Sequence, residues 1–492
     1  MTGNLKSDTW PQALRYFFIT RGWIYTLLIA GLCVLYALMT RVSTPVFVAF
    51  GAIPLLLTGA ILIIKNANLA FYVMFGLQFC LTLSTMFLDL KISVATIGTM
   101  VVSLALLIAR SIYRPFDWSR SFNGVFWLYF VWAAYCTLEL ANPNTVPEAW
   151  GIAIINYFIY PMFCALLAPI TIRNIKGIHW LLIIWSVFVL IAAFKGYWQK
   201  SHGFSTRDLY FLYVYGGAKT HLIWSGIRYF SCFTDAANFG VHMAMAMTTF
   251  GFSIFYVKSN WLKAYFAVVV LAATYCMFIS GTRSAIIIPL AGLLFFIILS
   301  GNKKTFLTGF VALIGLIFFF SFTTIGDSNQ YVRKMRSAFR PTADASYQVR
   351  VANRERIAEL MVSKPFGYGL GLSKGDRFRP KERMPYPPDS WLVATWVETG
   401  IVGFVLYLLI HGALFAWCSW ILLFKVMNKR LRGLLAAWLC ATGGFFVAAY
   451  ANDVMQYPNS IVVYTSFIIC FLGPYLDKQI EKDKKKENPE TV

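Results

Sequence analysis

Residues 306–322 read FLTGFVALIGLIFFFSF and contain no charged side chain. Two other stretches are of the same kind, WIYTLLIAGLCVLYALMT at residues 23–40 and IVVYTSFIICFLGPYL at residues 461–476. Each is close to the roughly 20 apolar residues that a helix needs to cross the hydrocarbon core of a bilayer. These runs predict an all-α protein that crosses a membrane many times.

The composition of the 492-residue chain agrees with this class. Hydrophobic residues make up 59% and charged residues 13%, with a mean hydropathy of +0.64. A soluble domain carries roughly twice that charged fraction. The net charge of +22 does not indicate nucleic-acid binding, because the basic residues are scattered between apolar spans, where they set membrane orientation. We therefore expect membrane lipids, and no nucleic acid, among the partners.

Cysteine usage gives no disulfide or metal signal. The nine cysteines lie singly, mostly inside the apolar runs, and no C-x-x-C pair occurs. Cysteines of this kind are small apolar packing residues.

The apolar runs predict about fourteen transmembrane helices, and we expect the first to be retained because no small-residue cleavage site follows it. The expected spans are residues 23–40, 45–64, 69–88, 93–109, 122–140, 150–171, 178–194, 236–257, 264–280, 285–300, 305–323, 392–424, 433–451 and 461–476. An even number places both termini on one side of the membrane. The segments on that side hold 22 Lys and Arg residues, whereas the short opposite loops hold three. This asymmetry predicts cytoplasmic termini.

The spans divide the chain into seven parts. They are a cytoplasmic N-terminus (1–22), N-terminal transmembrane helices (23–194), a first long periplasmic loop (195–235), central transmembrane helices (236–323), a large periplasmic loop (324–391), C-terminal transmembrane helices (392–476) and a cytoplasmic Lys-rich tail (477–492). The large loop contains 13 Lys and Arg and seven acids. Such a basic external segment suggests an anionic ligand such as phosphate, pyrophosphate or an acidic sugar, or attraction to lipid headgroups.

Part of the large loop has helical character. In SYQVRVANRERIAELMVSK from Ser346, the residues Arg350, Arg354 and Ile357 fall on one stripe. Pro365 ends the helix, and the flexible turn PFGYGLG follows.

Three arginines stand out by position. Arg228 lies where the first long loop enters a span, Arg283 occupies a tight turn between two spans, and Arg350 opens the loop helix. The predicted topology places all three on the non-cytoplasmic face. Guanidinium groups bind phosphate oxygens in a bidentate fork and stay charged, which suits a pyrophosphate site at the membrane surface. The alternative is that they anchor helices by snorkelling to headgroups.

Four motifs follow one another between residues 228 and 403. They are R-x4-F-x4-N from Arg228, SGTRSA from Ser280, R-x14-PFGYGLG from Arg350 and DSWLVATWVETGIVG from Asp389. In residue type, order and spacing they resemble the motifs of the O-antigen ligase and O-antigen polymerase superfamily. This chain departs from the family pattern in two places, with Ala237 where the family has Pro and Asp389 where much of the family has His.

The resemblance implies a bacterial inner-membrane glycosyltransferase of GT-C-like fold, active on the periplasmic face in lipopolysaccharide or polysaccharide biosynthesis. The implied donor is a glycan on undecaprenyl pyrophosphate, and transfer inverts the anomeric carbon. The acceptor is a lipid A core, a second lipid-linked glycan or a protein hydroxyl, and the sequence does not separate these. The early external loops offer Asp89, Glu139 and Glu148 but no Asp-x-Asp pair. We therefore expect no metal and no cofactor, with arginines in place of the metal.

The expected site follows from the motifs. Arg228 and Arg283 are predicted catalytic residues and, with Arg350 and Arg354, predicted ligands of the pyrophosphate. Asp389 is a predicted catalytic base or else a cap of the next helix.

Three further residues, Ser390, Glu398 and His221, are acceptor-side or secondary candidates. A second function, a transporter or flippase of anionic lipid-linked saccharides, would also use external arginines. A transporter of this kind would be expected to carry charged residues at mid-membrane in two repeated halves of the chain. The predicted spans carry few charges, and no internal repeat is evident.

Overall fold

The computed structural model describes residues 66–86, 92–113, 117–223, 226–300, 303–339, 345–373 and 384–487, and in addition residues 31, 59–61, 63 and 64. The predicted span at 23–40 and most of that at 45–64 therefore lie outside the described residues. From residue 61 on, the described residues belong to one compact unit, made of residues 61–86 and 91–492.

The N-terminal part of the unit consists of apolar helices of different lengths. They are α3 (Ala70–Ser84), α4 (Ile92–Tyr113), α5 (Gly124–Leu138), α6 (Pro147–Ile154), α7 (Tyr160–Thr171) and α8 (Ile175–His202). Short 3-10 turns at Ala67–Leu69, Ser119–Ser121 and Glu139–Ala141 flank them, and a π-helical turn at Ile155–Ile159 joins α6 to α7. Pro147 at the first position of α6 and the Asn123 side chain at the start of α5 favour these helix beginnings.

The central and C-terminal parts complete the bundle. They contribute α11 (Ala236–Ser253), α12 (Asn260–Ile279), α13 (Ile287–Leu299), α14 (Lys303–Phe322), α18 (Trp391–Phe424), α19 (Lys429–Ala449), α20 (Asn459–Phe471) and α21 (Gly473–Glu487). Helix α19 packs against α11, α13, α18 and α20. In α19, 83% of the apolar span is buried, more than in any other candidate span among the described residues.

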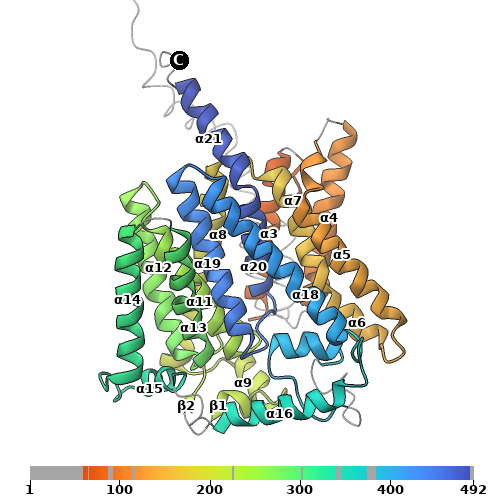
Figure 1. The fold of residues 1–492 in the computed structure, drawn as a ribbon, viewed down its shortest axis with the longest axis vertical. Coiled ribbons are helices and arrows are strands. Elements are labelled where there is room, and N and C mark those ends of the chain that lie inside the picture. Colours follow the sequence, from red (N-terminus) through yellow and green to blue (C-terminus); the bar gives the residue numbers. More distant parts are fainter. Residues whose placement is uncertain are drawn as a thin grey trace, which may run out of the picture. The chain divides into compact units, whose positions relative to one another are not determined.

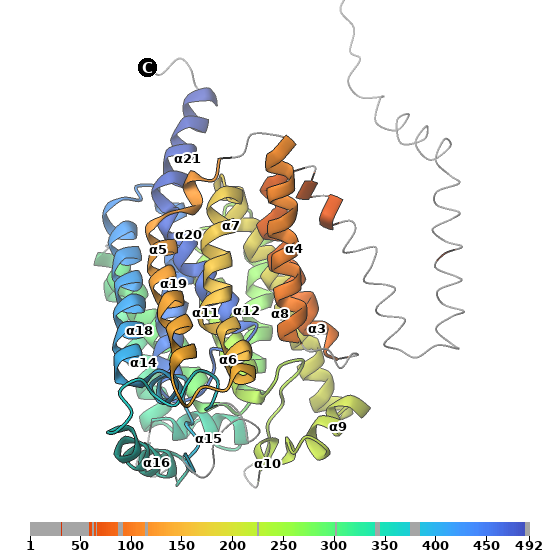
Figure 2. The same ribbon diagram turned by 90° about the vertical axis from the view of Figure 1, so that its right-hand side faces the viewer.

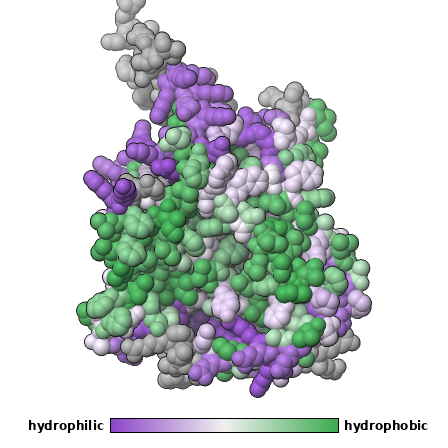
Figure 3. All heavy atoms as spheres, in the orientation of Figure 1, coloured by the Kyte–Doolittle hydropathy of each residue, from purple (hydrophilic) through white to green (hydrophobic). Residues whose placement is uncertain are grey.

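The membrane-spanning character is confirmed, but the number of fourteen spans is not. Among the described residues, eight helices are long and apolar enough to cross a membrane, or nine if the bent pair α20–α21 is one span. The predicted span at 236–257 is helix α11, which is not among the eight. The predicted spans at 285–300 and 305–323 correspond to the shorter apolar helices Arg283–Leu299 and Phe306–Phe322. Figure 3 shows an apolar band between two polar ends of the unit.

The two long loop regions lie at the same end of the bundle. The first contains α9 (Thr206–Tyr213), α10 (Ala218–His221) and the antiparallel strands β1 (Leu222–Ile223) and β2 (Gly226–Ile227), and the second contains α15 (Gln330–Ser337) and α16 (Ala345–Met361). Figures 1 and 2 show these elements opposite α21. We call the two ends the loop end and the α21 end. Helix α8 continues to His202, beyond the predicted end at residue 194, so the first loop is shorter than predicted.

Helix α18 is broken, although the sequence predicted one continuous helix over 392–424. Gly400 has a φ of +64°, and two helical parts meet there. Such a φ favours glycine because it lacks a Cβ. The part before Gly400 lies at the loop end, and Figure 1 shows it running in a different direction from the longer part.

Candidate active site

The turn that follows α16 fills the break in α18. The Tyr368 amide donates to the Val397 carbonyl oxygen at 2.9 Å, and the Val402 amide donates to the Pro365 carbonyl oxygen at 3.3 Å. A Cβ atom on Gly400 would lie 2.0 Å from that same Pro365 oxygen. The PFGYGLG turn and the ETG segment of the fourth motif, residues 398–400, therefore form one joint, which fixes α16 against the start of α18.

Arg228 lies beyond β2, and three hydrogen bonds hold its guanidinium. They reach the Ser280 carbonyl at 3.4 Å, the Thr220 carbonyl at 3.2 Å and the Thr282 hydroxyl at 3.1 Å. Two of these acceptors belong to the SGTRSA turn. Arg283 is half-buried at the start of the 3-10 turn there, and its charge acts on that of Arg228. The first two sequence motifs therefore meet at the loop end.

Lys334 of α15 is a site residue that the sequence motifs did not single out. Its exposed fraction is 8%, and its Nζ has no hydrogen-bond partner among the described residues. Burial, and then the charges of Arg228 and Arg283, lower the pKa of Lys334 to about 8. A buried cation without a partner is costly, so this position favours an incoming anion. The basic run YVRKMRS marks the segment, but the sequence does not distinguish this lysine from Arg333, which is exposed, or from Arg336, which pairs with Asp327.

Arg350 and Arg354 project from α16 towards the end of α19. Arg350 Nη1 donates to the Ala451 carbonyl oxygen at 2.8 Å, and Arg354 Nη2 donates to the Tyr450 carbonyl oxygen at 2.8 Å. The Arg354 guanidinium also lies 4.2 Å from the centre of the Tyr450 ring. The last carbonyls of a helix lack partners within it and carry partial negative charge, so they attract cations.

The segment after α19 also connects the other motifs. The Asn452 side-chain amide donates to the Ser284 hydroxyl of the Arg283 turn. Its carbonyl accepts a hydrogen bond from the Trp391 amide, at the start of α18, at 3.1 Å. This segment had no role in the sequence prediction, because backbone carbonyls leave no mark on the sequence.

Asp389 does not cap α18. The helix begins at Trp391, and the Ser390 hydroxyl accepts the Val393 amide at 3.1 Å, so Ser390 is the cap. The alternative prediction that Asp389 caps this helix is therefore wrong, because the cap is the next residue, Ser390. Asn353 Nδ2 of α16 lies 3.5 Å from the Asp389 carboxylate, which also interacts electrostatically with Arg350. Ser390 itself is fully buried, which makes it a structural residue at the edge of the site.

The other two acceptor-side or secondary candidates, His221 and Glu398, are also buried. His221 is buried, with Nδ1 2.8 Å from the Gly217 carbonyl oxygen and Nε2 accepting the Ala236 amide at 3.1 Å. Burial lowers the pKa of His221 and keeps the ring neutral. Nε2 thus ties the first loop to α11, and Nδ1 fixes the ring within the loop. Glu398 is fully buried in the first part of α18, and the Ser373 hydroxyl donates to its carboxylate.

Five basic side chains at the loop end act on one another's charge. We call them the cationic cluster: Arg228, Arg283, Lys334, Arg350 and Arg354. Among the described residues, Asp235 acts on Arg228 and Asp389 acts on Arg350. An excess of positive charge held on several elements suits an anion with several oxygens. Among the described residues, no three His, Cys, Asp or Glu side chains gather in a way that fits a metal ion.

Residues 266–408 match the family model described as O-antigen ligase. This match supports the assignment of the chain to the O-antigen ligase and polymerase superfamily. No curated protein matches the chain. Four members of the cationic cluster and Asp389 lie within the matched residues, whereas Arg228 precedes them.

The superfamily assignment agrees with the architecture. An O-antigen ligase domain in a chain with several membrane-spanning helices supports a glycosyl-transferring membrane protein of ligase or polymerase type. The same assignment implies a lipid-linked glycan and an acceptor as substrates.

Proposed function

We propose that the protein transfers or polymerises a glycan carried on undecaprenyl pyrophosphate, at the periplasmic face of a bacterial inner membrane. The acceptor is a lipid A core, a second lipid-linked glycan or a protein hydroxyl. The observation that carries the proposal is the cationic cluster, in which Lys334 Nζ is buried without a hydrogen-bond partner among the described residues. A pyrophosphate group would supply the missing negative charge.

In the proposed reaction, negative charge develops on the leaving pyrophosphate, which we assign to the cationic cluster. The acceptor hydroxyl oxygen forms a bond to the anomeric carbon, and the bond from that carbon to the phosphate oxygen breaks. The electron pair remains on the released pyrophosphate, which gains one negative charge. Fixed cations lower the barrier because they stabilise this charge without rearranging. Attack from the side opposite the leaving group inverts the anomeric carbon.

The arginines differ in their roles. Arg228 and Arg283 lie in the turns of the first two motifs beside Lys334, and we assign them to the leaving pyrophosphate. The Ala451 and Tyr450 carbonyls orient Arg350 and Arg354, and an arginine carries five N–H donors, so one such bond leaves donors for a phosphate. No metal ion is required in this account, since the cluster supplies the positive charge.

Asp389 is the proposed base that accepts the acceptor's proton. It replaces the histidine that much of the family has, and a carboxylate can do this work if it reaches the proton. Because Ser390 caps α18, the Asp389 carboxylate is not needed there. Asn353 and Arg350 instead hold it beside the cationic cluster.

The sidedness of the proposal rests on two independent features. The asymmetry of Lys and Arg favours cytoplasmic termini. Both long loops, with the whole cationic cluster, lie at the end opposite α21. The loop end is then periplasmic, where a lipid-linked glycan made in the cytoplasm and flipped outward meets its acceptor.

Alanine variants of two cluster residues test the proposal in membranes. We expect Arg283→Ala and Arg350→Ala to abolish glycan transfer while the amount of protein in the membrane stays normal. Arg356→Ala is the matched control, because Arg356 is an exposed arginine on the same helix as Arg350. Normal transfer in both cluster variants would contradict a pyrophosphate site here.

A further inference from the structure

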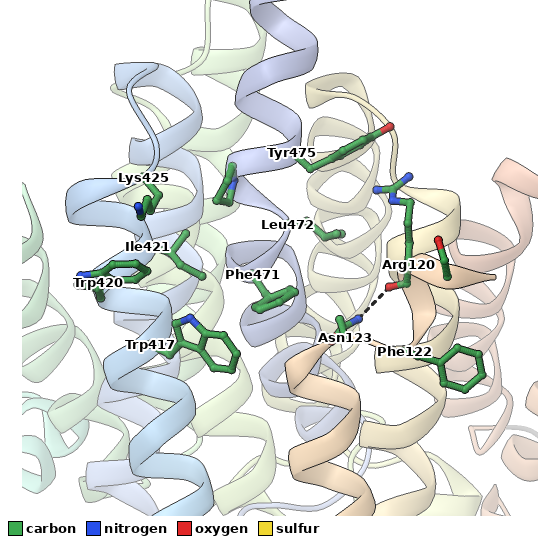
Figure 4. Close-up of a pocket in the computed structure, with 12 residues that line it drawn as sticks. Arg120, Phe122, Asn123, Trp417, Trp420, Ile421, Lys425, Phe471, Leu472 and Tyr475 are labelled. Carbon is green, nitrogen blue, oxygen red and sulfur yellow. Dashed lines mark hydrogen bonds between the residues drawn. The ribbon is translucent and has the colours of Figure 1, made fainter. Parts of the chain in front are cut away.

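A cavity of about 560 Å³ lies at the α21 end of the bundle, opposite the cationic cluster. It opens between the start of α5, the end of α18 and the junction of α20 with α21 (Figure 4). No sequence motif drew attention to it, and the proposed transfer reaction does not use it.

One half of the cavity is apolar. Trp417, Ile421, Phe471 and Leu472 line it, and Ile421 and Leu472 are otherwise buried. The Trp417 ring meets the Phe471 ring edge-on at 5.2 Å. These surfaces fit a hydrocarbon chain.

The other half carries positive charge. The Arg120 guanidinium lies 3.7 Å from the centre of the Tyr475 ring, and its buried Nη2 has no hydrogen-bond partner among the described residues. Lys425 lies on the opposite wall, with Nζ 5.0 Å from the centre of the Trp420 ring (Figure 4). Asp117 and Arg173 also act on the charge of Arg120, so the surroundings stay net positive.

The cavity lies where two candidate spans reach the membrane boundary. One span begins at Gly124, four residues after Arg120, and another ends at Phe424, next to Lys425. Phe122 and Trp420 are about half exposed at this level, as expected for aromatic residues at a membrane interface. The charged half therefore faces the headgroup region and the apolar half faces the hydrocarbon.

We infer that this cavity binds an anionic phospholipid, with the phosphate at Arg120, Lys425 on the opposite wall of the mouth, and an acyl chain against Trp417 and Phe471. Charge complementarity identifies the headgroup, because a cation lies on each side of the mouth and Arg120 Nη2 has no hydrogen-bond partner among the described residues. The apolar half identifies a lipid and not a free phosphate, which would leave that surface without a partner. The inference is independent of the proposed transfer reaction.

Lipid retention by the purified protein tests the inference. The probes are phosphatidylglycerol, phosphatidylcholine with the same acyl chains, and inorganic phosphate, with bound lipid read by native mass spectrometry and stability by thermal unfolding. We expect the wild type to retain and be stabilised by phosphatidylglycerol in preference to phosphatidylcholine. Arg120→Gln/Lys425→Gln should weaken retention about fivefold for each residue removed.

The matched control is Lys429→Gln/Arg430→Gln, which removes two exposed cations at the same end without touching the cavity. It should keep the preference. Lys425→Gln alone provides a second variant, because Lys425 is exposed and its loss does not disturb the Arg120–Tyr475 contact. Equal retention of the two lipids by the wild type, or equal loss in the site and control variants, would overturn the inference. Stabilisation by inorganic phosphate as large as that by phosphatidylglycerol would also overturn it.

Discussion

Lys334 and Arg228 converge on Gly281, where a Cβ atom would lie 3.4 Å from the lysine Nζ and 3.3 Å from the arginine Cγ. The two cations come from different loops, more than a hundred residues apart in the chain. The charge of Arg228 acts on that of Lys334. Like charges that act on one another cost free energy unless an anion joins them. This pair is the strongest structural sign that the loop end receives a polyanionic substrate.

Lys334→Met should lower transfer activity without lowering the stability of the protein. Loss of a fixed cation at the leaving group should lower transfer by about 100-fold. Thermal unfolding of the ligand-free protein should occur at an equal or higher temperature, because an uncompensated buried charge is gone. Lys219→Met, at an exposed lysine of the same end, is the control and should change neither quantity. A clear loss of stability in Lys334→Met would show that the lysine serves the fold instead.

The pH dependence of donor binding should also depend on Lys334. With a pKa of about 8 in the free protein, the lysine is charged below that pH and loses its proton above it. Affinity for the anionic donor should therefore be highest below about pH 8 and fall as the pH rises. Lys334→Arg should bind with little change over this range, because arginine stays protonated. A titration of donor affinity in both proteins decides this, and identical profiles would contradict it.

Stability of the ligand-free protein should show the opposite trend. The pKa of Lys334 is lowered from its ordinary value of 10.5, so the unfolded chain holds more protons between about pH 8 and 10.5. Stability rises with pH wherever the unfolded state binds more protons. The contribution of Lys334 to the unfolding temperature should therefore become more favourable over that window, and it should be absent in Lys334→Met.

Asp389→Asn and Ser390→Ala should have different effects. Asn cannot accept the proton, so Asp389→Asn should abolish transfer while donor binding and unfolding temperature stay near normal. Ser390→Ala removes the cap of α18 and should cost about 1 kcal/mol of stability. Substantial transfer by Asp389→Asn would rule out the carboxylate as the base.

Gly400→Ala should disrupt the joint between the α16 turn and α18. The added Cβ would meet the Pro365 carbonyl oxygen at 2.0 Å and force alanine to a φ of +64°. The expected loss of stability is roughly 2–5 kcal/mol. Gly412→Ala in the same helix is the control, since nothing lies within 4 Å of its Cβ position, and it should stabilise slightly. Equal unfolding temperatures for the two variants would argue against the joint.

The sequence predicted the helical class, because apolar runs of membrane-spanning length depend on side-chain type. It also predicted the convergence of Arg228, Arg283 and Arg350, because charge and motif spacing depend on side-chain type too. It did not predict the partners that fix Arg350 and Arg354, which are the carbonyls of Ala451 and Tyr450. Any residue type offers a carbonyl, so no sequence pattern marks one.

Helix ends were the weakest part of the prediction. A cap depends on the conformation of one residue, so Asp389 and Ser390 were equivalent in sequence until the start at Trp391 was known. Lys334 was missed for a related reason. It is buried without a hydrogen-bond partner among the described residues, whereas Arg333 is exposed and Arg336 pairs with Asp327.

The most direct test is turnover by the purified protein in detergent with EDTA, given an undecaprenyl-pyrophosphate-linked glycan and each candidate acceptor in turn. The account predicts release of undecaprenyl pyrophosphate together with a new glycoconjugate, and the acceptor consumed distinguishes ligase, polymerase and protein glycosylation. Passage of the intact donor across liposomes containing the protein, with no transfer to any acceptor, would contradict it and indicate a transporter.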